Sequence, residues 1–311
     1  MSNTKGYWFP LAASADVGRT PVSLVRRGEQ FVFWRSGEEL VCMQDRCPHR
    51  GAKLSLGKIN PQAGTLRCPF HGLEFGVDGH CAKVPVEHDQ SFCKEFSVPS
   101  LKVIESGGYI WLWQGEETDV LPSVPFHPDL QGFLYGQSTT LWPAHYTRCI
   151  ENVCDYSHLP FVHRWTIGGG LRDPVVDLEM EDVPGGFRAH LMDNGKRRQY
   201  IEFLYPNMWL LKLSNGMNMT AVFAPVDNFQ TAVYGRWFYR KSFPGKHSLM
   251  NLWSAISQFI VFREDWPIVH SQNPGDVLEA NHEKLLPSDA PVIAYRKIYN
   301  KYSKINPVFD N

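Results

Sequence analysis

Four side chains that commonly bind metals stand in two matched pairs early in the chain. Cys47 and His49 form a Cys-x-His pair, and after eighteen intervening residues Cys68 and His71 form a Cys-x-x-His pair. Two thiolates and two imidazoles are the ligands of a Rieske [2Fe–2S] centre, in which the cysteines hold one iron and the histidines hold the other. Because only two thiolates contribute charge, such a centre accepts an electron at roughly −150 to +300 mV. The pattern predicts an electron-transfer site.

Zinc is the alternative occupant, because Cys2His2 sites bind it with the same residue types. Zinc fingers, however, usually place the two cysteines together and the two histidines together, whereas each half mixes them here. The run over 72–79, Gly-Leu-Glu-Phe-Gly-Val-Asp-Gly, also suits the turn that closes over a Rieske cluster. The sequence therefore favours iron and sulfide over zinc.

A second possible metal site lies in a stretch of helical character that ends near residue 158. Asn152, Asp155 and His158 follow one another at intervals of three, so on a helix they share one face. Pro160 disfavours helix at the preceding residue, and the resulting loop can bring His163 back beside His158. Two imidazoles and one carboxylate form the facial triad of non-haem Fe(II) oxygenases, which leaves metal positions open for O2. Two structural histidines in the interior are the alternative.

The carboxylate of this triad must come from elsewhere in the chain. Glu264 and Asp265 are adjacent on a long helix-like segment, so they point about a third of a turn apart and only one can face a cavity. Asp155 is a rival ligand, but it lies one turn before His158 and better suits a supporting role. A solvated Asp265 paired with Arg263 is the alternative without a metal. The pattern leaves the choice between Glu264 and Asp265 open.

The composition excludes several classes of function. The chain has 311 residues, 43% of them hydrophobic, and a formal net charge of −1 at pH 7, so nothing indicates a nucleic-acid or membrane surface. Its apolar runs are shorter than a membrane span, and its first residues lack the apolar core of a signal peptide. Seven cysteines at spacings unlike a disulfide framework predict a cytoplasmic location. The five cysteines that are not cluster ligands are expected to be buried apolar residues: Cys42, Cys81, Cys93, Cys149 and Cys154.

Strand and helix patterns divide the chain into two parts. Residues 1–117 read as short strands separated by Gly, Pro and Asp, which predicts a small β domain. A Pro- and acid-rich connector follows over 116–130. Residues 118–311 contain the helical stretch, a meander of strands between 186 and 240, and a helix over 246–270. That helix is predicted from apolar residues at helical spacing: Leu249, Leu252, Trp253, Ile256, Phe259 and Ile260.

Together the two ligand sets resemble those of the Rieske non-haem iron oxygenases, specifically their catalytic alpha subunits. Cys-Pro-His-Arg-Gly, Cys-Pro-Phe-His-Gly, Asn-x-x-Asp-x-x-His-x-x-x-x-His and Glu-Asp-x-Pro-Ile occur in the family's order and span almost the whole chain. The resemblance implies an α+β fold. An N-terminal all-β Rieske domain over 1–117 is followed by a helix-grip, START-like catalytic domain over 118–311, whose antiparallel sheet surrounds a long C-terminal helix.

The resemblance also assigns metal ligands. It implies that the [2Fe–2S] cluster is held by Cys47, His49, Cys68 and His71. It implies that a mononuclear Fe2+ is held by His158, His163 and Asp265, because the family uses the second acid of that segment. Electrons are expected from NAD(P)H through a separate ferredoxin or flavin reductase, since the chain has no dinucleotide-binding Gly-x-Gly-x-x-Gly.

Two residues near the iron ligands have supporting roles in the family. Asn152 lies beside the ligands without binding the metal. Asp155 corresponds to a carboxylate that bridges subunits, so it is expected to touch His71 of the next subunit and His158 of its own. A head-to-tail contact of this kind closes a ring, most simply a homotrimer.

The implied reaction uses O2 to hydroxylate or demethylate an aromatic or polycyclic small molecule. The short chain resembles the branch of vanillate and dicamba demethylases, toluenesulfonate methyl-monooxygenase and saxitoxin hydroxylases. Phe70 and Leu73 depart from the residues common beside the cluster. A cis-dihydroxylating dioxygenase subunit is the nearest alternative, and a Rieske electron carrier is the alternative of another class. The substrate cavity is expected to be lined by Phe203, Trp209, Leu211, Phe223 and Ile256.

Overall fold

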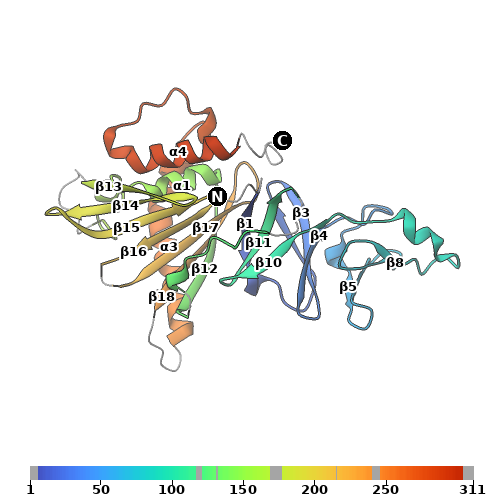
Figure 1. Cartoon of the computed structure of the whole chain (residues 1–311). Coiled ribbons are helices and arrows are strands. Elements are labelled where there is room, and N and C mark those ends of the chain that lie inside the picture. Colours follow the sequence, from blue (N-terminus) through green and yellow to red (C-terminus); the bar gives the residue numbers. More distant parts are fainter. Residues whose placement is uncertain are drawn as a thin grey trace. The chain divides into compact units, whose positions relative to one another are not determined.

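The computed structural model describes residues 6–116, 121–130, 132–168, 177–214, 216–239 and 246–303 (Figure 1). The chain divides into two compact units, Met1–Val124 and Pro125–Asn311. Each unit has its own apolar core, with Trp34 and Phe75 buried in the first and Phe203 and Tyr295 buried in the second. The domain boundary predicted between residues 117 and 118 falls within residues 117–120, which lie outside the described ranges.

The first unit consists of three small antiparallel sheets. One has the order β1-β11-β10 and contains β1 (Gly6–Ala13), β10 (Val103–Ser106) and β11 (Tyr109–Gly115). Another has the order β2-β3-β4-β9 and contains β2 (Val22–Arg26), β3 (Glu29–Ser36), β4 (Glu39–Gln44) and β9 (Ser100–Leu101). The third has the order β5-β6-β7-β8 and contains β5 (Lys58–Asn60), β6 (Thr65–Arg67), β7 (Glu74–Phe75) and β8 (Cys81–Lys83). The predicted β domain is therefore confirmed.

The second unit is built on one antiparallel sheet of seven strands in the order β12-β18-β17-β16-β15-β14-β13. Its strands are β12 (Leu134–Trp142), β13 (Leu178–Val183), β14 (Gly186–Asp193), β15 (Lys196–Leu204), β16 (Met208–Lys212), β17 (Asn218–Pro225) and β18 (Thr231–Tyr239). Asn194 and Gly195 form the turn between β14 and β15 with positive φ angles of 50° and 69°, as hairpins of this type require. The meander and the α+β class are thus confirmed.

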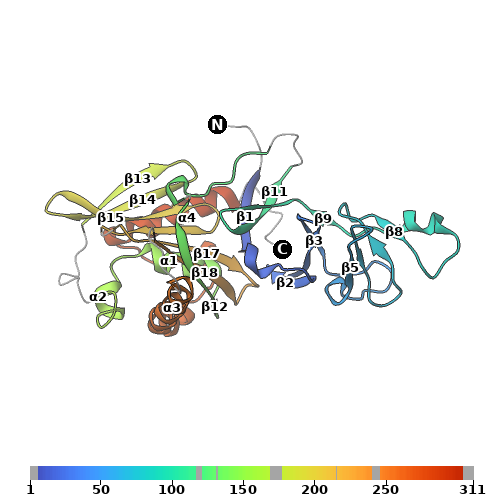
Figure 2. The ribbon, with the colours of Figure 1, turned by 90° about the horizontal axis from the view of Figure 1, so that it is seen from below.

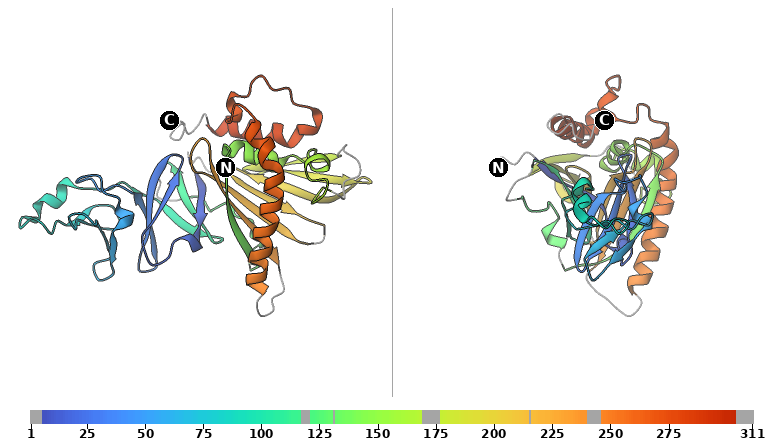
Figure 3. Two further views of the ribbon diagram at one scale, coloured as in Figure 1. Left: turned by 180° about the vertical axis from the view of Figure 1, so that it is seen from behind. Right: turned by 90° about the vertical axis from the view of Figure 1, so that its right-hand side faces the viewer.

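Four α-helices are found in the described part of this unit: α1 (Tyr146–Cys154), α2 (Leu159–Val162), α3 (Lys246–Ser271) and α4 (Ala290–Ser303). Figures 2 and 3 show α3, drawn in orange, crossing one face of the sheet. The helix expected to reach His158 ends four residues earlier, at Cys154. Pro160 starts the short α2 instead of leading into a loop, because the first turn of a helix needs no N–H from proline. No described helix is long and apolar enough to cross a membrane.

The long helix α3 faces the sheet with a different side from the one predicted. Five of its apolar residues, here called the outer stripe, are 44–62% exposed: Leu249, Leu252, Ile256, Phe259 and Ile260. The inner side is polar where it meets β12. Asn251 Oδ1 accepts a hydrogen bond from the backbone N–H of Gln137 at 2.8 Å, and the Ser254 and Ser138 hydroxyls lie 3.0 Å apart. Gly136 permits this close contact, because a Cβ there would fall 2.5 Å from the Met250 carbonyl oxygen. Helical periodicity alone cannot distinguish an outer apolar stripe from an inner one.

Candidate active site

The predicted cluster ligands lie on two loops of similar geometry, one after β4 and one after β6. In each loop a cysteine carbonyl accepts a hydrogen bond from the amide of the glycine four residues later. The distance is 2.8 Å from Gly51 to Cys47 and 3.2 Å from Gly72 to Cys68. Both glycines have positive φ angles, 74° and 75°, which other residues rarely adopt. The two Cys-Pro-x-x-Gly segments therefore form matching turns.

The four side chains of these turns converge, with the thiols inside and the imidazoles nearer the surface. Cys47 and Cys68 are each 2% exposed, and burial, followed by the neighbouring Cys68 thiol, raises the pKa of Cys47 to about 11. The rings of His49 and His71 lie 4.6 Å apart. Desolvation lowers the pKa of His71, and its Nδ1 is buried with no hydrogen-bond partner among the described residues. Two thiols and two imidazoles in this arrangement fit a Rieske cluster.

The buried carboxylate of Glu74 ties together the hairpin that carries the second loop. It accepts hydrogen bonds from the Thr65 hydroxyl at 2.7 Å, the Asn60 amide at 3.1 Å and the Arg67 guanidinium at 2.6 Å. Burial alone raises the pKa of Glu74, but these hydrogen bonds lower it overall. The network joins β5, β6 and β7 and so supports the loop between β6 and β7.

In the second unit, His158, His163 and Asp265 each offer one ligand atom, and all three atoms lie within 4.8 Å of one another. The two histidines flank α2, and their rings are 5.2 Å apart. Asp265 comes from α3, and its Oδ1 lies 2.9 Å from His163 Nε2 and 3.7 Å from His158 Nε2. This oxygen is buried, yet no described donor reaches it with hydrogen-bond geometry. The arrangement fits a shared metal ion bound by a facial triad.

Glu264 lies beside these three residues and orients one of them. Its Oε2 accepts hydrogen bonds from His163 Nδ1 at 2.6 Å and from the Thr166 hydroxyl at 2.7 Å. A proton held on Nδ1 leaves the Nε2 lone pair of His163 directed toward Asp265, as metal-binding histidines require. The sequence left Glu264 and Asp265 as rivals. In the structure only Asp265 faces both histidines, and the acid beside it has this separate role.

Asp155 stands at the end of α1 in a similar relation to the other histidine. Its Oδ2 lies 3.3 Å from His158 Nδ1, and its Oδ1 accepts a hydrogen bond from the Ser157 amide at 2.7 Å. Burial alone raises the pKa of Asp155, but the contact with His158 lowers it overall. Asn152, one turn earlier in α1, lines the adjoining cavity. Both residues singled out in the sequence are thus next to the three converging side chains.

A buried ion-pair network holds α1 in place. Arg148 is 2% exposed and donates hydrogen bonds to Glu151 at 2.8 Å, to Glu283 at 2.7 Å and to the Pro274 carbonyl at 2.8 Å. Arg296 of α4 pairs with both acids. The network therefore fixes the helix that leads to the candidate metal site against α4 and the segment before it.

A cavity of about 420 Å³ adjoins the three converging side chains, between the sheet, α1 and α3. Its volume is within the range of about 300–1,000 Å³ typical of small-molecule sites. The sheet and the residue after β16 contribute Gln199, Ile201, Trp209, Leu211, Leu213, Met219, Ala221, Phe223 and Trp237. Helix α3 contributes Trp253, Ser257, Gln258, Val261, Phe262 and Asp265. The lining is mainly apolar and aromatic.

Three of the five predicted lining residues face this cavity, namely Trp209, Leu211 and Phe223. The prediction was wrong for Phe203, whose ring packs 5.0 Å from that of Tyr295 on α4. It was also wrong for Ile256, which belongs to the outer stripe of α3. The polar inner face of α3 was not predicted, although Ser254, Gln258 and Asp265 recur there at helical spacing.

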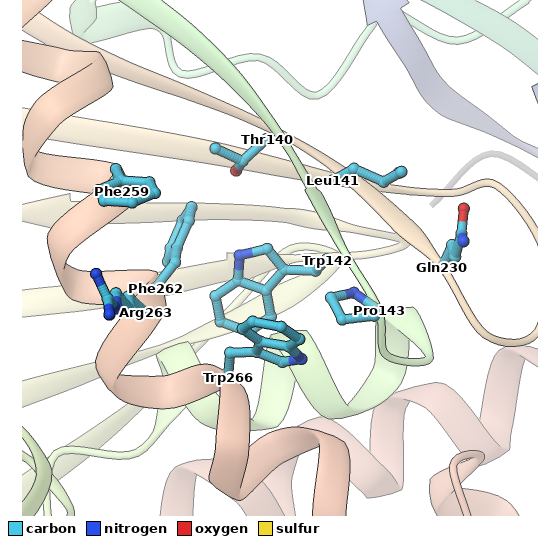
Figure 4. Close-up of a pocket in the computed structure, with 9 residues that line it drawn as sticks. All are labelled: Thr140, Leu141, Trp142, Pro143, Gln230, Phe259, Phe262, Arg263 and Trp266. Atoms are coloured by element: carbon cyan, nitrogen blue, oxygen red, sulfur yellow. The ribbon is translucent and has the colours of Figure 1, made fainter.

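A second hollow, of about 570 Å³, is lined by Thr140, Leu141, Trp142, Pro143, Gln230, Phe259, Phe262, Arg263 and Trp266 (Figure 4). Phe262 lines both hollows and meets Trp142 edge to face at 4.5 Å. The larger hollow contains none of the three metal-binding candidates. The smaller cavity is therefore the candidate active site.

Comparison with known families supports both metal centres. Residues 7–102 match the family described as the Rieske [2Fe-2S] domain. Residues 142–304, just over half of the chain, match the family described as the vanillate O-demethylase oxygenase C-terminal domain. The two matches contain all of the candidate cluster and iron ligands.

Individual relatives point in the same direction. Chlorophyllide a oxygenase of Chlamydomonas reinhardtii is 35% identical over 179 residues, 56% of this chain and only 26% of that protein. Vanillate O-demethylase oxygenase subunit of a Pseudomonas species is 29% identical over 73% of this chain and 61% of its own length. Methylxanthine N1-demethylase NdmA of Pseudomonas putida is 27% identical over 94% of this chain and 87% of that protein. The chain thus spans less than two thirds of the first two.

Solved structures share the fold. Dicamba monooxygenase bound to dicamba superposes with a TM-score of 0.79, covering 98% of each chain at 19% identity. Pseudomonas putida NdmA with caffeine gives a TM-score of 0.74, covering 94% of this chain and 89% of that chain at 24% identity. At this level of identity the likeness concerns the fold alone.

Proposed function

Because the chain belongs to the Rieske non-haem iron oxygenases and has the C-terminal domain of vanillate O-demethylases, we propose that it is a monooxygenase. It would transfer one oxygen atom from O2 to a small aromatic or polycyclic molecule. Hydroxylation of a methyl group on oxygen or nitrogen would lead to demethylation. One observation carries the proposal: two imidazoles and a carboxylate converge at the wall of an apolar cavity large enough for such a molecule.

The residues that would hold the two metal centres are those brought together in each unit. The cluster ligands are Cys47, His49, Cys68 and His71. The iron ligands are His158, His163 and Asp265. When bound, the cluster supplies single electrons and Fe2+ offers open positions to O2. The chain itself orients the two imidazoles through Glu264 and Asp155, and its apolar cavity excludes water from the reacting atoms.

Electron delivery is proposed to run between subunits. Asp155 touches His158 of its own chain and would touch His71 of a neighbour in a head-to-tail homotrimer. Exposure of the imidazole side of the cluster site supports this, since His49 is exposed and His71 is half-buried. The outer stripe of α3 supports self-association, because exposed apolar patches of this kind commonly mark interfaces. Electrons would come from NAD(P)H through a ferredoxin or flavin reductase. The proposed location is the cytoplasm, where the cysteines that are not cluster ligands would stay reduced.

Product analysis tests the reaction. The iron-loaded protein would be supplied with a surrogate reductase and a panel of methoxy-, methyl- and N-methyl-substituted aromatics and polycycles. Mass spectrometry is expected to show one added oxygen or the loss of a methyl group. Two added oxygens would instead establish the cis-dihydroxylating alternative.

Iron content separates the oxygenase from a pure electron carrier. The oxygenase is expected to bind one iron more than the two of the cluster, and the carrier is not. Substituting His163→Ala should remove that third iron and leave the visible absorption of the cluster unchanged. A wild-type protein that binds only the cluster irons would contradict the oxygenase proposal.

A further inference from the structure

Two cysteines that are not cluster ligands lie against each other beside the cluster site. Cys81 begins β8 and is 9% exposed, whereas Cys93 lies in the short helix η3 (Gln90–Glu95) and is half-buried. Cys93 packs against the apolar core to which Cys81 and the cluster ligand Cys47 belong. Burial raises the pKa of Cys81 to about 11, and contact with the Cys93 thiol adds to the rise. The first unit therefore contains a pair of adjacent thiols outside the ligand set.

Backbone hydrogen bonds hold the two cysteines in this relation. The Cys81 N–H donates to the Phe96 carbonyl at 3.2 Å, and the Phe96 N–H donates to the Cys93 carbonyl at 3.2 Å. The Gln90 side chain closes the loop between β8 and η3, since its Oε1 accepts from the Val84 N–H and its Nε2 donates to the Val84 carbonyl, both at 3.0 Å. A disulfide forms without movement of the backbone only where the two cysteine side chains face each other, as these do.

The segment that carries this pair covers both loops of the cluster site. The ring of Phe96 meets that of His49, on the first loop, edge to face at 5.9 Å. Pro85 lies against Gly72 on the second loop, where a Cβ would fall 3.3 Å from the proline Cγ. Both contacts belong to residues 81–96, here called the cluster cover. A covalent bond within the cover would restrict its opening away from the cluster site.

The two thiols differ in their access to solvent. A redox-active pair combines an accessible thiol, which reacts first, with a neighbouring thiol that completes the disulfide. Cys93 is the more exposed of the two, and Cys81 lies behind it in the core. The arrangement therefore assigns the first reaction to Cys93 and the second to Cys81.

We propose that Cys81 and Cys93 are a reversible modification site, at which oxidised glutathione converts the two thiols into a disulfide that locks the cluster cover. The Cys93 thiolate attacks one sulfur of oxidised glutathione, which forms a mixed disulfide and releases one glutathione thiolate. Cys81 gives its proton to that thiolate and attacks the Cys93 sulfur, which releases the second glutathione. Two protein thiols are thereby oxidised by two electrons, and the oxidant is reduced to two thiols that carry the protons. In a reducing compartment the pair stays reduced until the oxidant accumulates.

Peptide mapping of the full chain, loaded with both metal centres and equilibrated in increasingly oxidised glutathione buffers, tests the site. Free thiols are blocked with N-ethylmaleimide, and the chain is cut by trypsin and a Glu-specific protease, so that peptides 75–83 and 88–94 each contain one cysteine. The two peptides are expected to be joined in oxidised samples and separate after dithiothreitol. Separate peptides in the most oxidised buffer, glutathione left on Cys93 alone, or loss of the cluster absorption before the peptides join would each overturn the proposal.

The stability of the cluster tests whether the disulfide locks the cover. In excess iron chelator, the visible absorption of the cluster should decay at least about threefold more slowly in the oxidised protein than after dithiothreitol, because a crosslink restricts local opening. C93A should abolish this difference, whereas C42A, at a buried cysteine of the same unit, should keep it. If C93A does not fold, C93S takes its place. Equal rates in the two forms of the wild type, or a difference that survives in the Cys93 variant, would overturn the proposal.

These outcomes are separable from those of the proposed function, because neither measurement requires a substrate or turnover. Oxygenation by a protein whose two peptides never join would leave the monooxygenase proposal intact and refute the modification site. Joined peptides in a protein that never binds a third iron would do the reverse.

Discussion

Each histidine beside the candidate iron position is oriented by its own carboxylate. Glu264 accepts a hydrogen bond from His163 Nδ1 at 2.6 Å, and Asp155 lies 3.3 Å from His158 Nδ1. Such acceptors fix the ring orientation and make Nε2 a better ligand. The shorter contact is made by Glu264, which the sequence suggested only as an alternative to Asp265 as the metal ligand. The two acids are expected to differ in what they control.

Glu264 is expected to control metal affinity. Glu264→Gln should weaken Fe2+ binding by about 10- to 100-fold, because an amide is a poorer acceptor for the Nδ1 proton than a carboxylate. Competition between the apo site and a coloured chelator measures this affinity. Glu279→Gln, at an exposed position, is the matched control and should bind like wild type. Equal affinities in the two variants would show that Glu264 does not position the ligand.

Asp155 is expected to control electron delivery. Asp155→Asn should leave both metals bound and lower turnover by about 10-fold or more, since the bridging carboxylate is lost. Stopped-flow absorption checks the cause, because the pre-reduced cluster should be reoxidised more slowly by O2 in the presence of substrate. Normal turnover in this variant would remove the bridging role.

At the scale of secondary-structure elements, two polar networks hold the ligand-bearing segments. Arg148 and its acidic partners fix α1 against α4, and Glu74 joins the strands on either side of the second cluster loop. Each network centres on a buried charged group, Arg148 or Glu74, so the loss of that group or of its main partner leaves a buried charge or polar group without a partner. These networks are expected to contribute more to stability than ion pairs at the surface.

The Arg148 network is tested by Arg148→Met. The substitution should lower the free energy of unfolding by about 3–5 kcal/mol, because Glu151 and Glu283 lose a buried partner. Arg197→Met breaks the exposed pair with Glu179 and should cost about 1 kcal/mol or less. Urea unfolding followed by circular dichroism compares the two. Equal effects would mean that the buried network does not anchor α1.

The Glu74 network predicts a defined dependence on pH. Because hydrogen bonds hold the pKa of folded Glu74 below its ordinary value of 4.5, its stabilisation is complete above that value and disappears as the pH falls through the folded pKa. Glu74→Gln should therefore lower stability by about 1.5–3 kcal/mol at neutral pH and by less in acid. Urea midpoints read from cluster absorption at several pH values measure the difference. A difference that stays constant with pH would contradict this account.

At the scale of the whole molecule, the outer stripe of α3 leaves large apolar side chains exposed on a single chain. Ile256 and Phe259 at its centre are 50% and 62% exposed. If the stripe lies in an interface between copies of the chain, the double substitution I256E/F259E should dissociate the assembly, because charged side chains are costly to bury there. Light scattering during size-exclusion chromatography measures the mass. Phe229→Glu, at an exposed aromatic outside the stripe, is the control, and an unchanged mass in the double variant would exclude the stripe from the interface.

Local chemistry in the sequence determined which residue types come together. The Cys-Pro-x-x-Gly turns need only glycine at a positive φ and hydrogen bonds within a few residues, so their matching shapes could be anticipated from Gly51 and Gly72. The meander was equally readable, because strand alternation and the Asn194-Gly195 turn are local signals.

Only the tertiary structure decided which side of each element faces the active site. The rotation of α3 is set by Gly136 and by hydrogen bonds to β12, contacts between residues more than a hundred positions apart. That rotation turns Asp265 and Gln258 toward the cavity and the apolar stripe outward, the opposite of what hydrophobic spacing indicates. Phe203 was likewise misplaced because α4 covers its end of the sheet. Periodicity records that a helix or strand has two faces, whereas contacts between distant segments determine which face is buried.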